Sequence, residues 1–244
     1  MAESLDLARQ LALHLDSLRA AGVLFVPRGN PLALPRPVAA APVEDAVDPL
    51  EARRHALAVL STEVAACDKC SELFSTRMQP VFGTGPLDAE VMFVGAAPGP
   101  DEDARGEPFV GKGGQLLGRM CAACGFTREQ VYLLTIIKCK PPKNRAPTNA
   151  ECANCRDFFR RQFEAVKPKF VVALGAVAAR LLAGKKGTVS DLRGAVLSYR
   201  DVPLVCTHHP DDIERDATGA LKREAWDDLK LMLSATGRPV PGAR

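Results

Sequence analysis

Acidic, aromatic and glycine residues that could do chemistry are concentrated in residues 91–117, with the sequence VMFVGAAPGPDEDARGEPFVGKGGQLL. The apolar run at 91–94 predicts a buried strand, and the small residues at 95–99 predict a turn directly after it. Three acids follow, and Phe109 then precedes a second glycine-rich turn. Carboxylates, an aromatic face and a closely approachable backbone together predict a ligand site beyond the carboxyl end of this strand. The three acids are Asp101, Glu102 and Asp103.

The spacing of glycine and lysine within residues 106–112 matches that of a phosphate-binding P-loop, but the other residues do not fit one. Gly113 stands where a magnesium-binding Ser or Thr is required. Pro108 has no N–H to donate, and Glu107 would repel a phosphate group. We therefore expect no nucleotide cofactor.

Cysteine is the second residue type that could do chemistry, with eight copies and no secretory signal pattern at the N-terminus. This usage points to an intracellular metal or redox role rather than to a disulfide scaffold. Three pairs have two residues between their members: Cys67 and Cys70, Cys121 and Cys124, and Cys152 and Cys155.

The surroundings of the cysteines separate candidate ligands from core residues. Cys67 and Cys70 lie beside charged residues at the end of a predicted helix, and lysines on both sides of Cys139 favour its thiolate. Apolar neighbours predict instead that three cysteines belong to the core. Those three are Cys121, Cys124 and Cys206. The predicted ligands are Cys67, Cys70, Cys139 and one of Cys152 or Cys155.

The elements that must position these residues alternate along the chain. The sequence has 244 residues, 47% of them hydrophobic, and a net charge of +3, and it contains no run long enough to cross a membrane. Four continuous apolar strands separated by helices predict a three-layer α/β/α domain around a central four-stranded parallel sheet. The strands are expected at 91–94, 131–137, 170–174 and 203–207, and the helices at 113–124, 149–166, 175–183 and 220–234.

The N-terminal part, residues 1–48, differs in composition from the rest. Leucines at helical spacing predict a helix over residues 5–21, and the proline- and alanine-rich segment at 27–49 predicts a flexible linker. The helix is either a dispensable tail or a site for a protein partner. We expect the domain proper to span residues 49–238.

Several motifs in one collinear order resemble the family 4 uracil-DNA glycosylases, the iron–sulfur members of their superfamily. The matching pieces are GAAPGPDED, GEPFVGKGGQLL, KCKPPKNRAPT, ALGAVAARLL and the pair His209-Pro210, within roughly residues 55 to 235. The resemblance implies a DNA repair hydrolase that excises uracil and leaves an abasic site. We also expect an intracellular, cytoplasmic protein, with a monomer as the default oligomeric state.

The resemblance assigns roles to individual residues. It places a 4Fe–4S cluster on Cys67, Cys70, Cys139 and Cys155, leaving Cys152 as a neighbour. Phe109 would stack on the flipped base, and His209 would hydrogen-bond its O2 atom. Backbone groups around Ala97 and Asp101 would read the edge of the base. Glu102, with Asp101 beside it, would align water and stabilise the sugar cation.

This chain departs from the family pattern at three places. Ala96 replaces a glutamate, and Thr135 replaces an asparagine that reads the base edge through both of its amide atoms. Asp211-Asp212 follows the His-Pro pair, on a loop expected to approach DNA phosphates. These departures leave open two alternatives: a weakly active or non-catalytic DNA-binding paralogue, and a glycosylase that prefers deaminated purines.

DNA contact is expected from a basic, proline-stiffened loop at the rim of the site. Its members are Lys140, Lys143, Asn144 and Arg145. Lys185 and Lys186 form a second basic patch.

Overall fold

The computed structural model describes residues 2–23 and 48–241, and the chain divides into two units, Met1–Ala46 and Val47–Arg244. In the first unit, α1 (Ala2–Ala20) forms the predicted helix and exposes its apolar Leu11, Leu13 and Leu15. The linker predicted at 27–49 lies almost entirely outside the described residues. None of the described helices has the length and apolar character needed to span a membrane.

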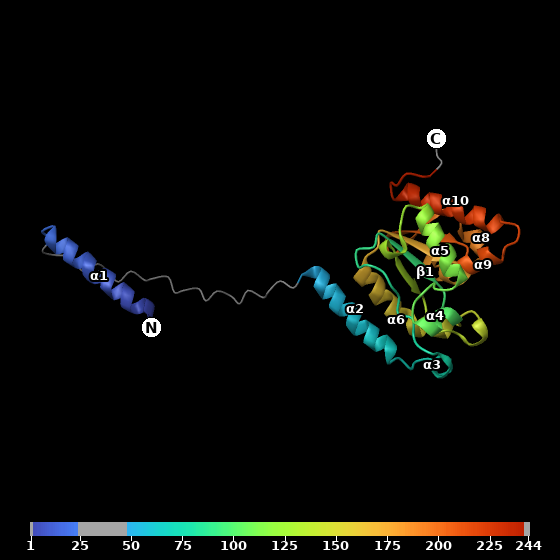
Figure 1. Ribbon diagram of the computed structural model, residues 1–244, viewed down its shortest axis with the longest axis horizontal. Helices are drawn as coiled ribbons and strands as arrows, with labels where there is room; N and C mark the ends of the chain where they lie inside the picture. The colour runs from blue at the N-terminus through green and yellow to red at the C-terminus, as the bar shows by residue number, and fades with distance from the viewer. Residues whose placement is uncertain (1, 24–47, 242–244) are drawn as a thin grey trace. The chain divides into compact units, whose positions relative to one another are not determined.

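The second unit is built on one sheet with helices on both faces (Figure 1). Its strands are β1 (Val91–Gly95), β2 (Tyr132–Thr135), β3 (Phe170–Leu174), β4 (Val196–Tyr199) and β5 (Val202–Thr207). Their order across the sheet is β2-β1-β3-β5-β4, and the strands β2, β1, β3 and β5 are parallel to one another. This confirms the predicted α/β class.

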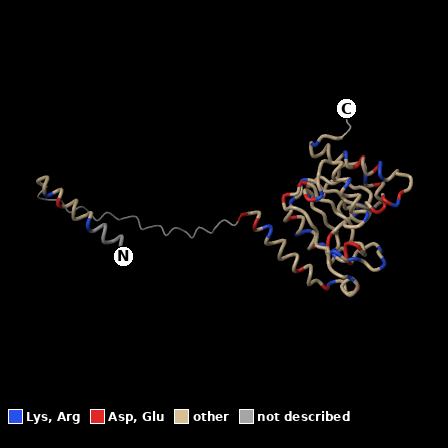
Figure 2. The backbone as a smooth tube through the Cα atoms, viewed as in Figure 1, with Lys and Arg blue, Asp and Glu red and all other residues tan. Residues whose placement is uncertain are grey.

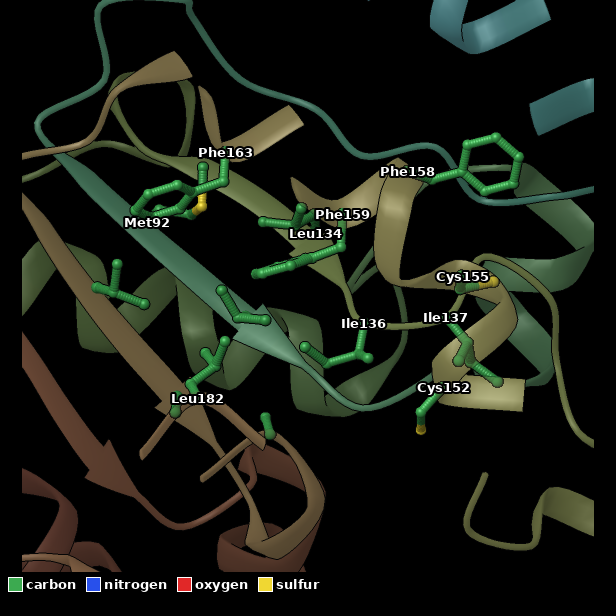
Figure 3. Packing of buried hydrophobic residues seen from close by; sticks show 14 of the residues in the cluster. Met92, Leu134, Ile136, Ile137, Cys152, Cys155, Phe158, Phe159, Phe163 and Leu182 are labelled. Atoms are coloured by element: carbon green, nitrogen blue, oxygen red, sulfur yellow. The ribbon is translucent and has the colours of Figure 1, made fainter. Parts of the chain in front are cut away.

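Alternate residues of each strand enter different cores, because successive side chains point to opposite faces of a sheet. Met92 and Val94 pack toward α2 (Pro49–Ala65) and α6 (Asn149–Val166), whereas Phe93 packs toward α5 (Lys112–Ala123) and α10 (Ala220–Ala235). Figure 3 shows Phe159 and Phe163 of α6 lying over Met92 and Leu134. The strands read as continuous apolar runs because both of their faces are covered.

Short helices connect these layers or flank the carboxyl edge of the sheet. They are α3 (Ser71–Thr76), α4 (Pro100–Arg105), α7 (Ala176–Ala183), α8 (Val189–Leu192) and α9 (Pro210–Arg215), with the single 3-10 turns η1 (Arg128–Gln130) and η2 (Pro142–Asn144).

The prediction of four strands was wrong, because β4 adds a fifth strand that is antiparallel to β5. This edge strand is short and only partly buried, so it lacks the continuous apolar run that marked the other four. Arg200 and Asp201 form the tight turn between β4 and β5, both with positive φ (48° and 65°). Two-residue hairpins of this kind usually contain Asn or Gly, so the sequence carried little turn signal.

Candidate functional site

A cavity of about 370 Å³ opens at the carboxyl edge of the sheet. Ala97 follows β1, Thr135 ends β2, Val177 follows β3 and His209 follows β5, so all four parallel strands contribute to its wall. The segment after β1 adds Glu102 of α4 and Phe109, and the loop after β2 adds Pro141 and residues 144–147. The ends of parallel strands meet at one edge, which is why residues so distant in sequence converge here.

Phe109 is seated at the end of β1 by two glycines. A Cβ atom on Gly95 would lie 2.8 Å from Cζ of the Phe109 ring, and one on Gly114 would lie 1.7 Å from the Phe109 carbonyl oxygen. Phe109 itself is 6% exposed and has a positive φ of 55°, a costly conformation for an aromatic residue. Strained, well-packed residues of this kind are typical of binding sites.

Glu102 connects the two glycine-rich turns. Its Oε2 accepts a hydrogen bond from the Gly99 N–H at 3.0 Å, and its Oε1 accepts one from the Val110 N–H at 2.9 Å and a longer one from the Gly111 N–H at 3.4 Å. The carboxylate also lines the cavity. It is therefore an immobile negative charge beside the Phe109 loop. Asp101 lies outside the cavity wall, exposed on α4 with its carboxylate against Gly111.

His209 faces Phe109 across the cavity, with ring centroids 6.1 Å apart and an angle of 33° between the rings. The Asp211 N–H donates to Nδ1 of His209 at 3.2 Å, so in the neutral ring the proton sits on Nε2. Burial lowers the pKa of His209 below its ordinary 6.5, although the carboxylates of Asp211, Asp212 and Glu102 act in the opposite direction. The neutral ring with an Nε2–H donor is therefore the favoured form.

Thr135 is 2% exposed, and its hydroxyl donates to the Ile137 carbonyl oxygen at 2.7 Å. The hydroxyl proton is thus already used within the protein. Lys138, itself fully buried, donates from Nζ to the Thr135 carbonyl oxygen at 2.8 Å. Thr135 therefore offers the cavity a lone pair on its hydroxyl oxygen, which can accept a hydrogen bond, and its methyl group.

The four residues expected to contact DNA fall into two groups in the structure. Lys140 pairs with the fully buried carboxylate of Asp103 at 3.1 Å, and Arg145 pairs with Glu151 at 2.7 Å. Lys143 and Asn144 instead lie exposed at the tip of the loop. Asn144 and Arg145 also line the cavity. Over the visible backbone, Lys and Arg are interleaved with Asp and Glu, in keeping with the small net charge (Figure 2).

Val177 and Arg215 also line the cavity, although the sequence did not single them out, and so does Asp211, one of the departures from the family pattern. Arg215 pairs with Asp212 at 2.6 Å, and the Asp211 carboxylate lies 3.5 Å from Nδ1 of His209. The place of Asp211, two residues after His209, had already marked it in the sequence. Nothing local marks Val177 or Arg215, because their positions depend on how α7 and α9 pack.

A second, narrow cavity brings together four cysteines: Cys67, Cys70, Cys139 and Cys155. Two donors point at their sulfurs, Arg77 Nη1 toward Cys139 at 3.0 Å and Asn154 Nδ2 toward Cys70 at 3.3 Å. Within the described ranges no three His, Cys, Asp or Glu side chains are arranged to hold a single metal ion. In a four-iron cluster each thiolate binds a different iron, so the sulfurs stand further apart than around one ion. Four thiols with N–H donors to sulfur suit such a cluster.

Cys152 and Cys155 lie on the same helix, yet only Cys155 lines this cavity. Figure 3 shows their sulfur atoms pointing in different directions. Cys121, Cys124 and Cys206 are buried among apolar side chains, as predicted, and burial raises the pKa of Cys121 to about 12.

Comparison with known proteins shows the family of the chain. Residues 82–230 match the uracil DNA glycosylase superfamily. The chain belongs to this superfamily. It is 41% identical to the Type-4 uracil-DNA glycosylase of Archaeoglobus fulgidus over 187 residues, 73% of this chain and 92% of that protein. The Type-4 enzyme of Thermotoga maritima is 36% identical over 180 residues, 73% of this chain and 93% of that enzyme.

A Type-5 uracil-DNA glycosylase, from Pyrobaculum aerophilum, is 34% identical over 195 residues, 67% of this chain and 85% of that protein. The superfamily match at 82–230 includes the whole wall of the first cavity together with Cys139 and Cys155. Cys67 and Cys70 precede it.

Proposed function

We propose that this protein is a type 4 uracil-DNA glycosylase, which hydrolyses the N-glycosidic bond of uracil in DNA and leaves an abasic site. The observation that carries the proposal is the convergence of Phe109, Glu102 and His209 on one cavity, in a chain that belongs to the superfamily. We expect the protein to be intracellular, because its proposed substrate is the DNA of the cell. That it works as a monomer, and that α1 binds a partner, stay predictions.

The target base must leave the duplex to enter this cavity. We assign the Phe109 ring to stacking against the flipped uracil, and backbone groups near Ala97 to reading its edge. When the bond between C1′ and N1 breaks, its electron pair stays on uracil and the sugar becomes a cation. The Nε2–H of His209 would donate to the O2 atom of the departing anion. A water oxygen then bonds to C1′, and the proton that this water loses to the solvent is balanced by the proton that neutralises the uracil anion.

Glu102 suits the stabilisation of the sugar cation because its charge is held in place before the reaction begins. Three backbone N–H groups fix its two oxygens, so no reorganisation is needed as positive charge develops. Asp101 is the neighbouring carboxylate, and its exposed position gives it a weaker influence on the cavity. We therefore assign the main role to Glu102.

We further propose that Cys67, Cys70, Cys139 and Cys155 hold a 4Fe–4S cluster. The chemistry that it would supply is cross-linking, because its four thiolate ligands would join the end of α2, the loop after β2 and α6. Arg77 and Asn154 would donate hydrogen bonds to the ligand sulfurs. Lys143 and Asn144, at the exposed tip of the loop after Cys139, would contact phosphate or sugar, with Lys140 and Arg145 behind them.

A strand-scission assay tests the function directly. The purified protein is incubated with labelled oligonucleotides that contain uracil, hypoxanthine or xanthine, and abasic sites are then cleaved with alkali. Scission of the uracil strand alone is expected. DNA that is retarded on a gel but remains intact on all three substrates would instead identify a binding protein without glycosylase activity.

Thr135 favours one alternative, a glycosylase with altered base preference. Because its hydroxyl proton is donated to Ile137, Thr135 cannot offer a donor–acceptor pair to a base edge. Scission at hypoxanthine or xanthine above that at uracil would support this alternative.

A further inference from the structure

Arg145 makes contacts that differ from those of a free phosphate-binding side chain. Its Nη1 and Nη2 donate to Oε2 and Oε1 of Glu151 at 2.9 and 2.7 Å, a two-pronged pair, and Nη2 also donates to Glu72 at 2.9 Å. Glu151 is 7% exposed, and its pKa is lowered to about 2, chiefly by the hydrogen bonds from Arg145. The carboxylates of Glu151 and Glu72 both pair with the guanidinium of Arg145. Its positive charge is therefore already compensated within the protein and does not attract a DNA phosphate.

Both carboxylates lie on segments that carry the clustered cysteines. Glu72 is in the first turn of α3, whose N-cap residue is Cys70. Glu151 is in the first turn of α6, four residues before Cys155, and it also accepts the Thr148 N–H at 2.7 Å in a capping box. Arg145 itself is on the loop that follows Cys139. It therefore connects three segments, each bearing a proposed ligand.

The loop beside Arg145 needs such support. Lys143 and Asn144 have positive φ values of 54° and 53°, a left-handed conformation that residues with a side chain rarely adopt. Two such residues in succession persist only where their surroundings hold them, and Arg145 follows them directly. Asn144 lines the cavity, and its neighbour Lys143 is exposed.

We propose that Arg145 is a positioning residue that holds the Lys143–Asn144 turn against the cysteine-bearing α3 and α6, so that the DNA-contacting turn is fixed through the same segments as the cluster. The proposal rests on the proposed function, since it takes DNA as the ligand of that turn. It assigns the phosphate contact to Lys143 and removes it from Arg145. A lysine in place of Arg145 would keep the charge but lose the two-pronged pairing with Glu151.

The test is a double-mutant cycle on DNA binding, read by fluorescence anisotropy with a duplex that contains a tetrahydrofuran abasic analogue. The variants of the purified, iron-loaded protein are Lys143→Gln, Arg145→Gln and the double variant. Lys143→Gln should raise Kd and lower the salt slope by about one. Arg145→Gln should raise Kd about tenfold. Adding Lys143→Gln to that variant should then change Kd by less than about twofold, because Lys143 no longer contacts the phosphate once the turn is displaced.

Independent, multiplicative effects of the two substitutions would overturn the proposal, as would an Arg145→Lys variant with the Kd of the unmodified protein. Trypsin cleavage after Lys143 supplies a second readout, and Arg145→Gln should accelerate it without loss of iron. Arg160→Gln is the matched control, because Arg160 makes comparable pairs with Asp157 and Glu164 on the exposed side of α6. It should change neither Kd nor cleavage.

If Arg145→Gln loses iron, Glu72→Gln takes its place in the cycle. The Glu72 side chain is 63% exposed, so its removal should spare the fold while loosening one of the two anchors. Faster cleavage after Lys143 and a raised Kd support the proposal, and unchanged values of both overturn it. Binding and proteolysis are measured without base release, so a failure of the glycosylase assay would be seen separately.

Discussion

The carboxylate of Glu102 accepts the Val110 N–H at 2.9 Å, one residue beyond the Phe109 that forms the aromatic wall of the cavity. The same carboxylate accepts the Gly99 N–H at 3.0 Å. A single side chain thus fixes the turn after β1 and the aromatic loop in one arrangement. Glu102 therefore has two properties: it stabilises these two turns, and it places a negative charge in the cavity.

Glu102→Gln should therefore impair both properties. Without the charge, we expect the single-turnover rate of uracil release to fall by about 10²–10³-fold, the range for loss of a preorganised electrostatic group. Loss of hydrogen bonds to a charged acceptor should also lower the free energy of unfolding by about 2 kcal/mol. Glu107→Gln, an exposed residue of the same loop, is the control. An unaltered rate in Glu102→Gln would remove this carboxylate from catalysis, and Asp101→Asn would then be the next test.

Phe109→Leu keeps an apolar side chain but removes the aromatic face. Stacking on a base contributes about 1–3 kcal/mol, so kcat/KM on a uracil oligonucleotide should fall by roughly 5- to 150-fold. Phe74→Leu serves as the comparison, since Phe74 is exposed on α3. Equal kcat/KM in the two variants would argue against stacking on Phe109.

Thr135→Asn should restore an amide that can both donate and accept at the end of β2. We expect the ratio of scission at uracil to scission at cytosine to rise about tenfold, because a two-point contact with a base discriminates by about 1–3 kcal/mol. Competition between the two oligonucleotides measures this ratio. If it stays constant while the fold is intact, residue 135 has no part in base reading.

His209 gives a pH prediction. Its pKa in the folded protein is below the ordinary 6.5, so the folded state binds fewer protons than the unfolded state as the pH falls through this window. The stability that neutral His209 contributes is present above pH 6.5 and is lost as the pH falls toward the folded pKa. His209→Gln should flatten the dependence of the unfolding free energy on pH between 7.5 and 5.5.

NMR titration of the His209 ring protons should show a midpoint below 6.5. A midpoint above that value would show that the carboxylates of Asp211, Asp212 and Glu102 outweigh burial.

Cys155→Ala and Cys152→Ala form a matched pair on α6. Because Cys155 alone of the two lines the four-cysteine cavity, only its loss should lower the iron content and the absorbance of a 4Fe–4S cluster. Iron analysis and visible spectra of the two purified variants decide the matter. Loss of iron from Cys152→Ala with retention in Cys155→Ala would reverse the assignment.

The sequence alone predicted the parallel strands and the edge at which the site lies. Continuous apolar runs and the glycine turns after them are local signals, and parallel strands must end at a common edge. The strand β4 was not predicted because it is short and partly exposed, and because the turn that connects it to β5 contains neither Asn nor Gly. Its place is fixed by pairing with β5, a contact that no local pattern encodes.

Tertiary structure decided which charged groups are free to act. In the sequence, Lys140, Lys143 and Arg145 form one basic loop, but in the folded chain Lys140 faces the buried Asp103 and Arg145 faces Glu151. Those partners lie on other elements, up to 37 residues away from the loop, so only folding reveals that the charges are compensated. Residue types determined what chemistry was possible here, and packing determined which of those residues remain available for it.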